Sequence, residues 1–342
     1  MATHIVTTTA DVVDENDGVL SLREAIALAN ADADADTITF AAGVSSATIV
    51  LTSELAITAD LTIDGDIDGD NKADVTISGN DASRIVNITG ATTDVALKSL
   101  TLTNGYSADH GGAVRAWDVG KLTILDTTIE NSKSDSYGGA IRVFGAEVEI
   151  VNSLIDHNVS GEEGGGLFMS DSDATIVNST FYYNEATNGG GGISTWTSNL
   201  DIYNSTIVNN WSALEGSGGG IGDLGSTITV ANSVIAVNVS GSDFADLDDV
   251  EGTLFSATNS AFSTSPTITT NQSNLINIVQ PGLASLADNG GTVQTLGLIE
   301  GSVLIDAGSN AAVFQDFLDL VRLAIGPASD KRRNPRTLDC FA

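Results

Sequence analysis

A pattern of about 26 residues recurs five times between residues 95 and 238, and it limits the chain to few folds. Repeats of this length indicate solenoids or propellers. Each copy begins with glycines and continues through short runs of alternating apolar and polar residues with no helical period, which indicates strands. We therefore predict an all-β fold, a single right-handed parallel β-helix of roughly ten coils stacked about 4.8 Å apart. The apolar residue after the glycines is expected to face the core in every copy: Val114, Ile141, Leu167, Ile193 and Ile221.

Asparagine or aspartate recurs at two places in the repeat. The first place closes a strand and holds Asp126, Asn152, Asn178, Asn204 and Asn232. The second lies six residues further on and holds Asn158, Asn184, Asn210 and Asn238, with Asn104 in the same place before the first copy. Asn tolerates the left-handed backbone of a sharp corner, and its amide can bond the copies above and below. We expect both sets to form ladders at the corners of the coil.

The segment 21–30, SLREAIALAN, is the one convincing helix before the C-terminus. Ser21 and Glu24 have the spacing of a capping box. An amphipathic helix ahead of a solenoid is expected to cover the first coil, whose apolar interior otherwise faces water. The apolar face of this helix is expected to contain Leu22, Ala25, Ile26 and Leu28.

The region around this helix also carries a family resemblance. The stretch VTTTADVVDENDGVLSLREAIALAN resembles the CSLREA motif at the N-terminus of bacterial right-handed β-helix proteins, which are related to polymorphic outer-membrane proteins and are pectate-lyase-like in fold. Leu20 stands where the family has Cys, so any role of that Cys is absent here. The resemblance extends through the glycine-rich coils to about residue 310. It implies an exported β-helix and little about chemistry.

We divide the chain into three regions. Residues 1–35 are expected to form the N-terminal strand and capping helix, and residues 36–310 the β-helix. Residues 311–342 change in character and are expected to form an atypical C-terminal cap or tail.

The chain is strongly acidic, with 45 Asp and Glu against 13 Lys and Arg and a net charge of -32. This charge disfavours nucleic acid and anionic membranes as partners. No apolar run is long enough to span a bilayer, and Cys340, the single cysteine, excludes an intramolecular disulfide. We expect a secreted or cell-surface monomer. The opening residues do not read as a signal peptide, so the export signal is expected outside this segment.

The stretch DGDIDGDNKAD contains a candidate calcium site. Alternate carboxylates around a glycine-turned loop can converge on one hard cation, as in the first half of an EF-hand loop. The match is partial because Val75 replaces the final Glu of that pattern. We expect a structural Ca²⁺ here, and the alternative is a solvated acidic turn. The candidate ligands are Asp64, Asp66, Asp68, Asp70 and Asp74.

The basic residues of the repeat region cluster between Lys98 and Arg142, and the next Lys or Arg is Arg322. If the apolar repeat positions point inward, the residues beside them point outward, because side chains alternate along a strand. Two arginines would then be neighbours on adjacent coils, with aromatic residues two positions further on. Aromatic rings stack on sugar rings while cations hold acidic substituents. The candidate residues for binding a polysaccharide or cell-surface glycan are Arg115, Trp117, Lys133, Arg142, Phe144 and Trp196.

The turns before these strands supply the candidate catalytic residues. In a polyuronate lyase, the arginines would neutralise a substrate carboxylate while His110, Lys133 or Tyr137 removed the neighbouring proton. In a glycoside hydrolase, two carboxylates from successive turns would flank the bond. The alternative is a non-catalytic adhesin-type module or rigid spacer, with the arginines paired to Asp118 or Glu147. The candidate catalytic residues are Asp109, His110, Asp135, Tyr137, Glu162 and Glu163.

Overall fold

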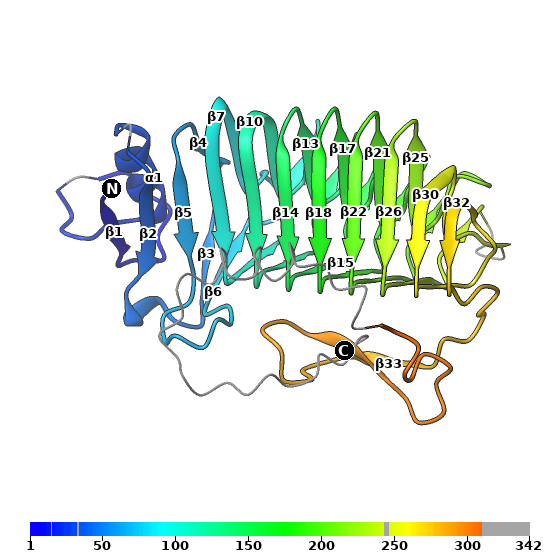
Figure 1. The fold of residues 1–342 in the computed structure, drawn as a ribbon. Helices are drawn as coiled ribbons and strands as arrows, with labels where there is room; N and C mark the ends of the chain where they lie inside the picture. The colour runs from blue at the N-terminus through cyan, green and yellow to red at the C-terminus, as the bar shows by residue number, and fades with distance from the viewer. Residues whose placement is uncertain (15, 33, 243–245, 310–342) are drawn as a thin grey trace.

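The protein is an elongated stack of parallel β-coils (Figure 1). The structure, a computed structural model, describes residues 1–309 except 15, 33 and 243–245; the region 311–342, expected as a C-terminal cap or tail, lies outside the described residues. The chain runs down the front sheet, returns behind it and advances along the stack, so the coil is right-handed (Figure 1). The predicted all-β parallel β-helix is confirmed.

Three sheets run along the stack, the third of them only from β9 onward, and nearly all of their pairings are parallel. The first sheet has a main row and an upper row that the longest strands, β7 and β10, join to it. The main row is β1 (Thr3–Val6), β2 (Asp36–Phe40), β5 (Leu61–Asp64), β7 (Val86–Lys98), β10 (Val114–Leu125), β14 (Glu147–Val151), β18 (Asp173–Val177), β22 (Asn199–Tyr203), β26 (Thr227–Ala231), β30 (Thr253–Thr258) and β32 (Thr267–Gln272). The upper row adds β4 (Leu55–Ile57), β13 (Ile141–Phe144), β17 (Leu167–Ser170), β21 (Ile193–Trp196) and β25 (Ile221–Leu224).

The other two sheets are built from shorter strands. The second sheet is β3 (Ala47–Val50), β6 (Val75–Ser78), β8 (Leu100–Thr103), β11 (Thr128–Glu130), β15 (Leu154–Asp156), β19 (Thr180–Tyr182), β23 (Thr206–Val208), β27 (Val234–Ala236) and β31 (Ala261–Phe262). The third sheet is β9 (Tyr106–Ser107), β12 (Lys133–Ser134), β16 (Val159–Ser160), β20 (Glu185–Ala186), β24 (Trp211–Ser212), β28 (Val239–Ser240) and β29 (Asp246–Leu247). Only β29 pairs antiparallel within these three sheets of the described chain.

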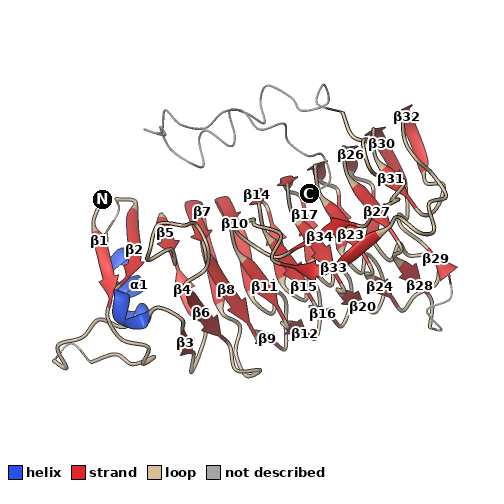
Figure 2. Ribbon diagram, turned by 90° about the horizontal axis from the view of Figure 1, so that it is seen from below, coloured by secondary structure: helices blue, strands red, loops and turns tan. Residues whose placement is uncertain are grey.

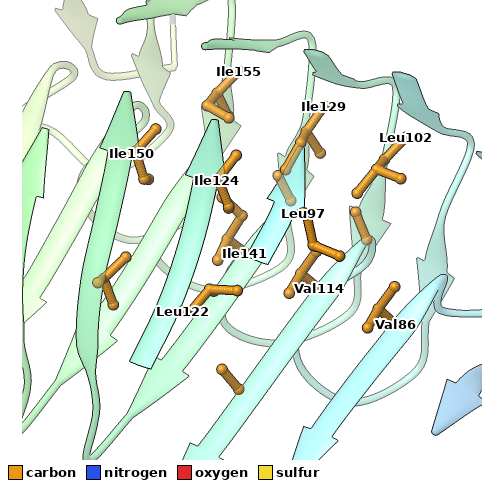
Figure 3. Close-up of a cluster of buried hydrophobic side chains, with 14 of the residues drawn as sticks. Val86, Leu97, Leu102, Val114, Leu122, Ile124, Ile129, Ile141, Ile150 and Ile155 are labelled. Carbon is orange, nitrogen blue, oxygen red and sulfur yellow. The ribbon is translucent and has the colours of Figure 1, made fainter. Parts of the chain in front are cut away.

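The core is a set of straight apolar rows, one residue per coil. Val114 pairs with Val86 on one side and Ile141 on the other, and the row continues along β17, β21 and β25. Each predicted inward residue after the glycines is fully buried, which confirms that part of the sequence analysis. Figure 3 shows these rows stacked with the rows of the second sheet, such as Ile129 and Ile155. Because the rows continue from coil to coil, the core has the length of the stack.

A buried asparagine ladder crosses four coils at the corner between the second and third sheets. The amide of Asn184 illustrates it: Nδ2 donates to Oδ1 of Asn210 (3.0 Å) and to the carbonyl of Ile155 (2.9 Å), while Oδ1 accepts from Nδ2 of Asn158 (3.0 Å). Asn238 ends the ladder on a carboxylate oxygen of Asp249, 3.2 Å away. The predicted ladder at this corner is confirmed. In this set the residue before each asparagine, such as His157, has the left-handed backbone.

The other corner, between the first and second sheets, also follows the sequence analysis. Asp126, Asn152, Asn178, Asn204 and Asn232 all have φ between 49° and 51°. Side-chain bonds link the first three of these residues, at 3.1 Å each. The placement of Asn104 was wrong by one residue. It is itself left-handed (φ 52°), and the equivalent of the buried asparagines in its coil is the glycine that follows it.

Helix α1 (Leu22–Asn30) covers the first coil, as expected (Figure 1). Ser21 and Glu24 form the predicted capping box, in which each side chain accepts a bond from the other residue's backbone N–H. Leu22, Ala25 and Ile26 are buried against the core. Leu28 was wrongly assigned to this face: its side chain is 50% exposed, and Ala29 takes the buried position instead. A short 3₁₀ helix, η1 (Ala42–Val44), follows β2.

The stack has about eight turns, fewer than the ten expected, because the chain leaves it after β32. The strands β33 (Leu283–Ala287) and β34 (Thr295–Leu298) form an antiparallel hairpin outside the coils (Figure 2). Leu296 and Leu304 pack on outward residues of β23 and β27, such as Val208. The last described residue, Ser309, exchanges two hydrogen bonds with the side chain of Asn232. No helix in the described part of the chain is long and apolar enough to cross a membrane.

Candidate functional site

The site is built on the outward side of the upper row of the first sheet, where the turns fold back onto the strands. Gly111 and Gly138 have φ of 63° and 72°, and a Cβ on either would lie 2.3 Å from the carbonyl oxygen three residues ahead. Only glycine fits this left-handed backbone at so close an approach. The repeated glycines therefore press the preceding turn, with its polar and aromatic side chains, against the outward residues of the sheet.

Arg115 and Arg142 are register partners on β10 and β13. Both guanidinium groups lie against the indole of Trp117, with Cζ 4.8 and 5.4 Å from the ring centroid. Arg142 is also 4.5 Å from the ring centroid of Phe168, the outward residue of the next coil. A cation near an aromatic face is attracted by the ring quadrupole, more strongly when it is shielded from water.

Arg142 is a buried cation without a carboxylate partner. It is only 6% exposed, and its guanidinium donates to the carbonyl of Val143 and to Oγ of Ser170 (3.0 Å). Burial, and then the charge of Arg115, lower the pKa of Arg142 to about 10. The Nε atoms of both arginines are buried and have no hydrogen-bond partner among the described residues. The site thus holds two positive charges that form no direct ion pair with a described carboxylate, although Asp171 and Asp109 act on Arg142 through space.

The alternative pairing of these arginines with Asp118 or Glu147 is wrong. Glu147 instead binds Nζ of Lys121 at 3.0 Å, and Lys121 also reaches Glu149 at 2.6 Å. Neither Arg115 nor Arg142 forms an ion pair with any carboxylate within the described ranges. The closest polar contact of Arg115 is the side-chain oxygen of Asn87, 3.5 Å from Nη1.

An aromatic cluster surrounds the two arginines. Trp117 stacks on Phe144 with ring centroids 4.7 Å apart, and Tyr137 contacts the ring of Trp196 at 5.4 Å. Phe168 is fully buried, and its ring lies 4.6 Å from that of Tyr137 and 5.1 Å from that of Trp196. Sequence reasoning missed Phe168, although its register position equals that of Arg142 and could have identified it. We call the following set the cation–aromatic face: Arg115, Trp117, Tyr137, Arg142, Phe144, Phe168 and Trp196.

His110 adjoins this face but has both ring nitrogens engaged. Nε2 lies 3.1 Å from Oδ1 of Asp109, and Nδ1 faces the backbone N–H of Tyr137 at 3.5 Å. Burial is the main cause of the lowered pKa of His110. Asp109 acts in the opposite direction and raises the pKa, whereas the nearby arginines lower it further. The imidazole is therefore neutral near pH 7. Its hydrogen bonds hold the turn in place and leave neither nitrogen directed at a ligand.

Arg84 also holds the turn that contains His110 and Gly111, and it was not identified from the sequence. Its guanidinium donates to the carbonyl of His110 (2.8 Å), to that of Gly111 (3.0 Å) and to Oγ of Ser107 (2.8 Å). It also forms an ion pair with Glu54. Arg84 is thus a positioning residue for the turn that covers the cation–aromatic face.

Of the four carboxylates expected in the turns, Glu163 joins the face. Its Oε2 accepts from Nε1 of Trp196 (2.9 Å) and from Oγ of Ser194 (2.7 Å). Glu162 instead accepts from the amide of Asn188, and Asp135 accepts from the hydroxyl of Tyr106 at 2.7 Å. Asp109 is bound to His110.

The remaining candidates in the turns have less direct roles. Lys133 is exposed on β12 of the third sheet. Its register partner there is Tyr106, so it does not lie in the row of the two arginines. Burial, followed by Glu162 and Glu163, raises the pKa of Tyr137, so its phenol keeps its proton at neutral pH.

Three of the five candidate calcium ligands converge in the loop after β5. Asp66, Asp68 and Asp74 each place one carboxylate oxygen within 4.8 Å of the others. Asp64 does not join them, because it is the register partner of Lys98 and binds its Nζ at 2.9 Å. Asp70 is likewise outside the group, and its carboxylate accepts from the backbone N–H of Lys72. Carboxylate oxygens in this number suit a hard cation, and Ca²⁺ stays a prediction for this loop.

Comparisons with known proteins concern the fold alone. No protein-family model matches the chain, and no curated protein matches it in sequence. Among solved structures, the chain is similar to the pectate lyase Pel9A, with a TM-score of 0.44, 12% sequence identity and coverage of 90% of this chain and 92% of that one. The resemblance to CSLREA-motif proteins accordingly remains a prediction.

Proposed function

We propose that the protein acts on an acidic polysaccharide outside the cell and binds it along the cation–aromatic face. The supporting observation is the buried and unpaired charge of Arg142 beside Arg115. Burying a cation without a counter-ion costs several kcal/mol, so a chain keeps such a group where an external anion can offset it. A carboxylate or sulfate on a sugar ring supplies that anion.

The net charge of -32 does not oppose this proposal. At physiological ionic strength fields are screened beyond about 8 Å, so the ligand responds mainly to the nearest charges. Arg115 is the half-buried member of the pair and would touch the anion directly. Arg142, its more deeply buried partner on the adjacent strand, would act through its field.

Of the two possible cleavage chemistries, the contacts favour hydrolysis over elimination. A lyase needs a base near the substrate carboxylate. His110 has both nitrogens engaged, and the pKa of Tyr137 is raised, so neither is suited to accept a proton near pH 7. Carboxylates, by contrast, lie at the edge of the face.

The test is binding to polygalacturonate, alginate and dextran sulfate, with neutral dextran as the control ligand. Arg115→Ala should weaken binding to the acidic polymers at least tenfold. Lys121→Ala is the matched control, because it removes the same charge from the same sheet but from a cation already paired with two glutamates. Equal and small effects of both variants would show that only net charge matters. Absence of binding to any polymer would favour the alternative, a non-catalytic adhesin-type or spacer module.

A further inference from the structure

One row of outward positions crosses the upper part of the first sheet and continues past its last strand. The row contains Arg115, Arg142, Phe168, Ser194 and Gly222, one residue per coil. In the next coil, Val250 forms an isolated parallel bridge with Ile221. The backbone N–H of Glu251 donates to the carbonyl of Ile221 at 2.9 Å, which places Glu251 beside Gly222. The row that contains the two arginines therefore also contains a glutamate.

A second glutamate reaches this row from a turn. Oε2 of Glu163 accepts from Oγ of Ser194, two positions before Glu251 in the row, and from the indole N–H of Trp196. Two strand spacings correspond to about 9.6 Å at the backbone. The position between them is Gly222, and the backbone of Gly190 and Ser217 lies over its outward side.

The two glutamates have different surroundings. Glu163 accepts from two donors, the hydroxyl of Ser194 and the indole N–H of Trp196. Glu251 is half-buried; burial, followed by Asp248, Glu163 and Asp223, raises its pKa, so it keeps a proton to higher pH. A carboxyl group with a raised pKa is suited to be the general acid of a glycosidase.

We infer that Glu163 and Glu251 are the catalytic carboxylates of a glycoside hydrolase that cleaves the chain bound on the cation–aromatic face. The inference rests on the proposed function and adds to it the reaction and its two residues. Glu251 donates its proton to the glycosidic oxygen as the bond from this oxygen to the anomeric carbon breaks. Glu163 takes a proton from a water molecule, whose oxygen bonds to the same carbon. One water is consumed, and proton exchange with solvent restores both glutamates.

The spacing favours an inverting reaction. Inverting enzymes separate their carboxyl groups by about 6.5–9.5 Å to make room for water, whereas retaining enzymes need about 5–5.5 Å. Two coils of separation exceed the retaining distance and lie close to the upper end of the inverting range.

The experiment compares the wild-type protein with Glu163→Gln and Glu251→Gln on the acidic polymer that the protein binds. Reducing ends are measured for turnover, proton NMR gives the anomeric configuration of the new end, and titration gives the affinity. Each Gln variant should lose at least 100-fold in kcat, as expected for loss of a general acid or base. Affinity should stay within about threefold, and the product should be inverted. Glu185→Gln, an exposed glutamate on β20, is the control and should keep full turnover.

The outcomes separate this inference from the proposed function. If the wild-type protein binds the polymer and releases no reducing ends, the catalytic assignment is overturned while polysaccharide binding stands. Unsaturated uronate products, or retention of configuration, would also overturn it. If no polymer binds, the proposed function itself fails. Should Glu251→Gln not fold, Glu251→Asp keeps the carboxyl group, and its pH profile should shift while its melting temperature stays near that of the wild type.

Discussion

Arg115 and Arg142 are register partners on adjacent strands, and both guanidinium groups lie against one indole, that of Trp117. Like charges directly opposite each other on neighbouring strands are destabilising. The pair therefore lowers the stability of the folded protein when no anion is bound. The first prediction tests this.

Arg142→Met should make the unliganded protein more stable. The substitution removes a buried charge whose desolvation is costly, and it relieves the repulsion from Arg115. The bonds to Ser170 and to the carbonyl of Val143 are lost, so we expect a net gain of only about 1 kcal/mol. Urea denaturation measures it, and affinity for the acidic polymer should fall in the same variant. A large loss of stability would instead assign Arg142 a structural role.

The buried asparagine ladder should contribute more to the free energy of unfolding than the row with Asn152 and Asn178 at the other corner. Asn184 is fully buried, and its amide bonds both neighbouring coils. Asn184→Ala leaves buried donors unpaired and should cost on the order of 3 kcal/mol. Asn178→Ala is the comparison, because its half-buried amide donates one side-chain bond, to Asn152, and should cost about 1 kcal/mol. Equal losses in urea denaturation would contradict this ranking.

Stability should depend on pH through Asp249, which is fully buried at the end of that ladder. Burial raises its pKa from 3.8 to about 6. The folded protein therefore binds a proton more tightly than the unfolded chain. The corresponding stability is complete below pH 3.8 and is lost as the pH rises through about 6.

At one pKa unit per 1.36 kcal/mol, this contribution is about 3 kcal/mol. Asp249→Asn should remove it, so the difference in unfolding free energy between wild type and variant should change between pH 4 and 6. The measurement is chemical denaturation over that range. A constant difference would show that Asp249 does not titrate in it.

Calcium should stabilise the loop after β5. A ligand at 100 times its dissociation constant adds about 2.7 kcal/mol to stability, so a chelator should lower the melting temperature. Asp66→Asn should abolish this response, since Asp66 belongs to the converging group. Asp70→Asn is the matched control from the same loop and should keep it. A melting temperature that is the same with calcium and with chelator would refute the prediction.

The sequence alone was sufficient to predict the repeating part of the fold. Inward rows such as Val114 and Ile141 follow from alternation within a strand, and the ladder of Asn184 follows from identical residues at identical places in successive copies. Both features depend on a residue and its nearest neighbours, one coil away. A one-coil pattern repeated along the chain can be read without coordinates.

Only the tertiary structure decided what departs from the repeat. Arg142 is outward by alternation, yet it is buried because the turn at Gly111 and the ring of Phe168 cover it. Glu251 lies in the same row as the arginines because Val250 bridges Ile221, and no repeated motif predicts this bridge. The hairpin β33–β34 leaves the stack although its sequence continues the β pattern. These outcomes depend on packing between segments far apart in the chain, which local alternation does not encode.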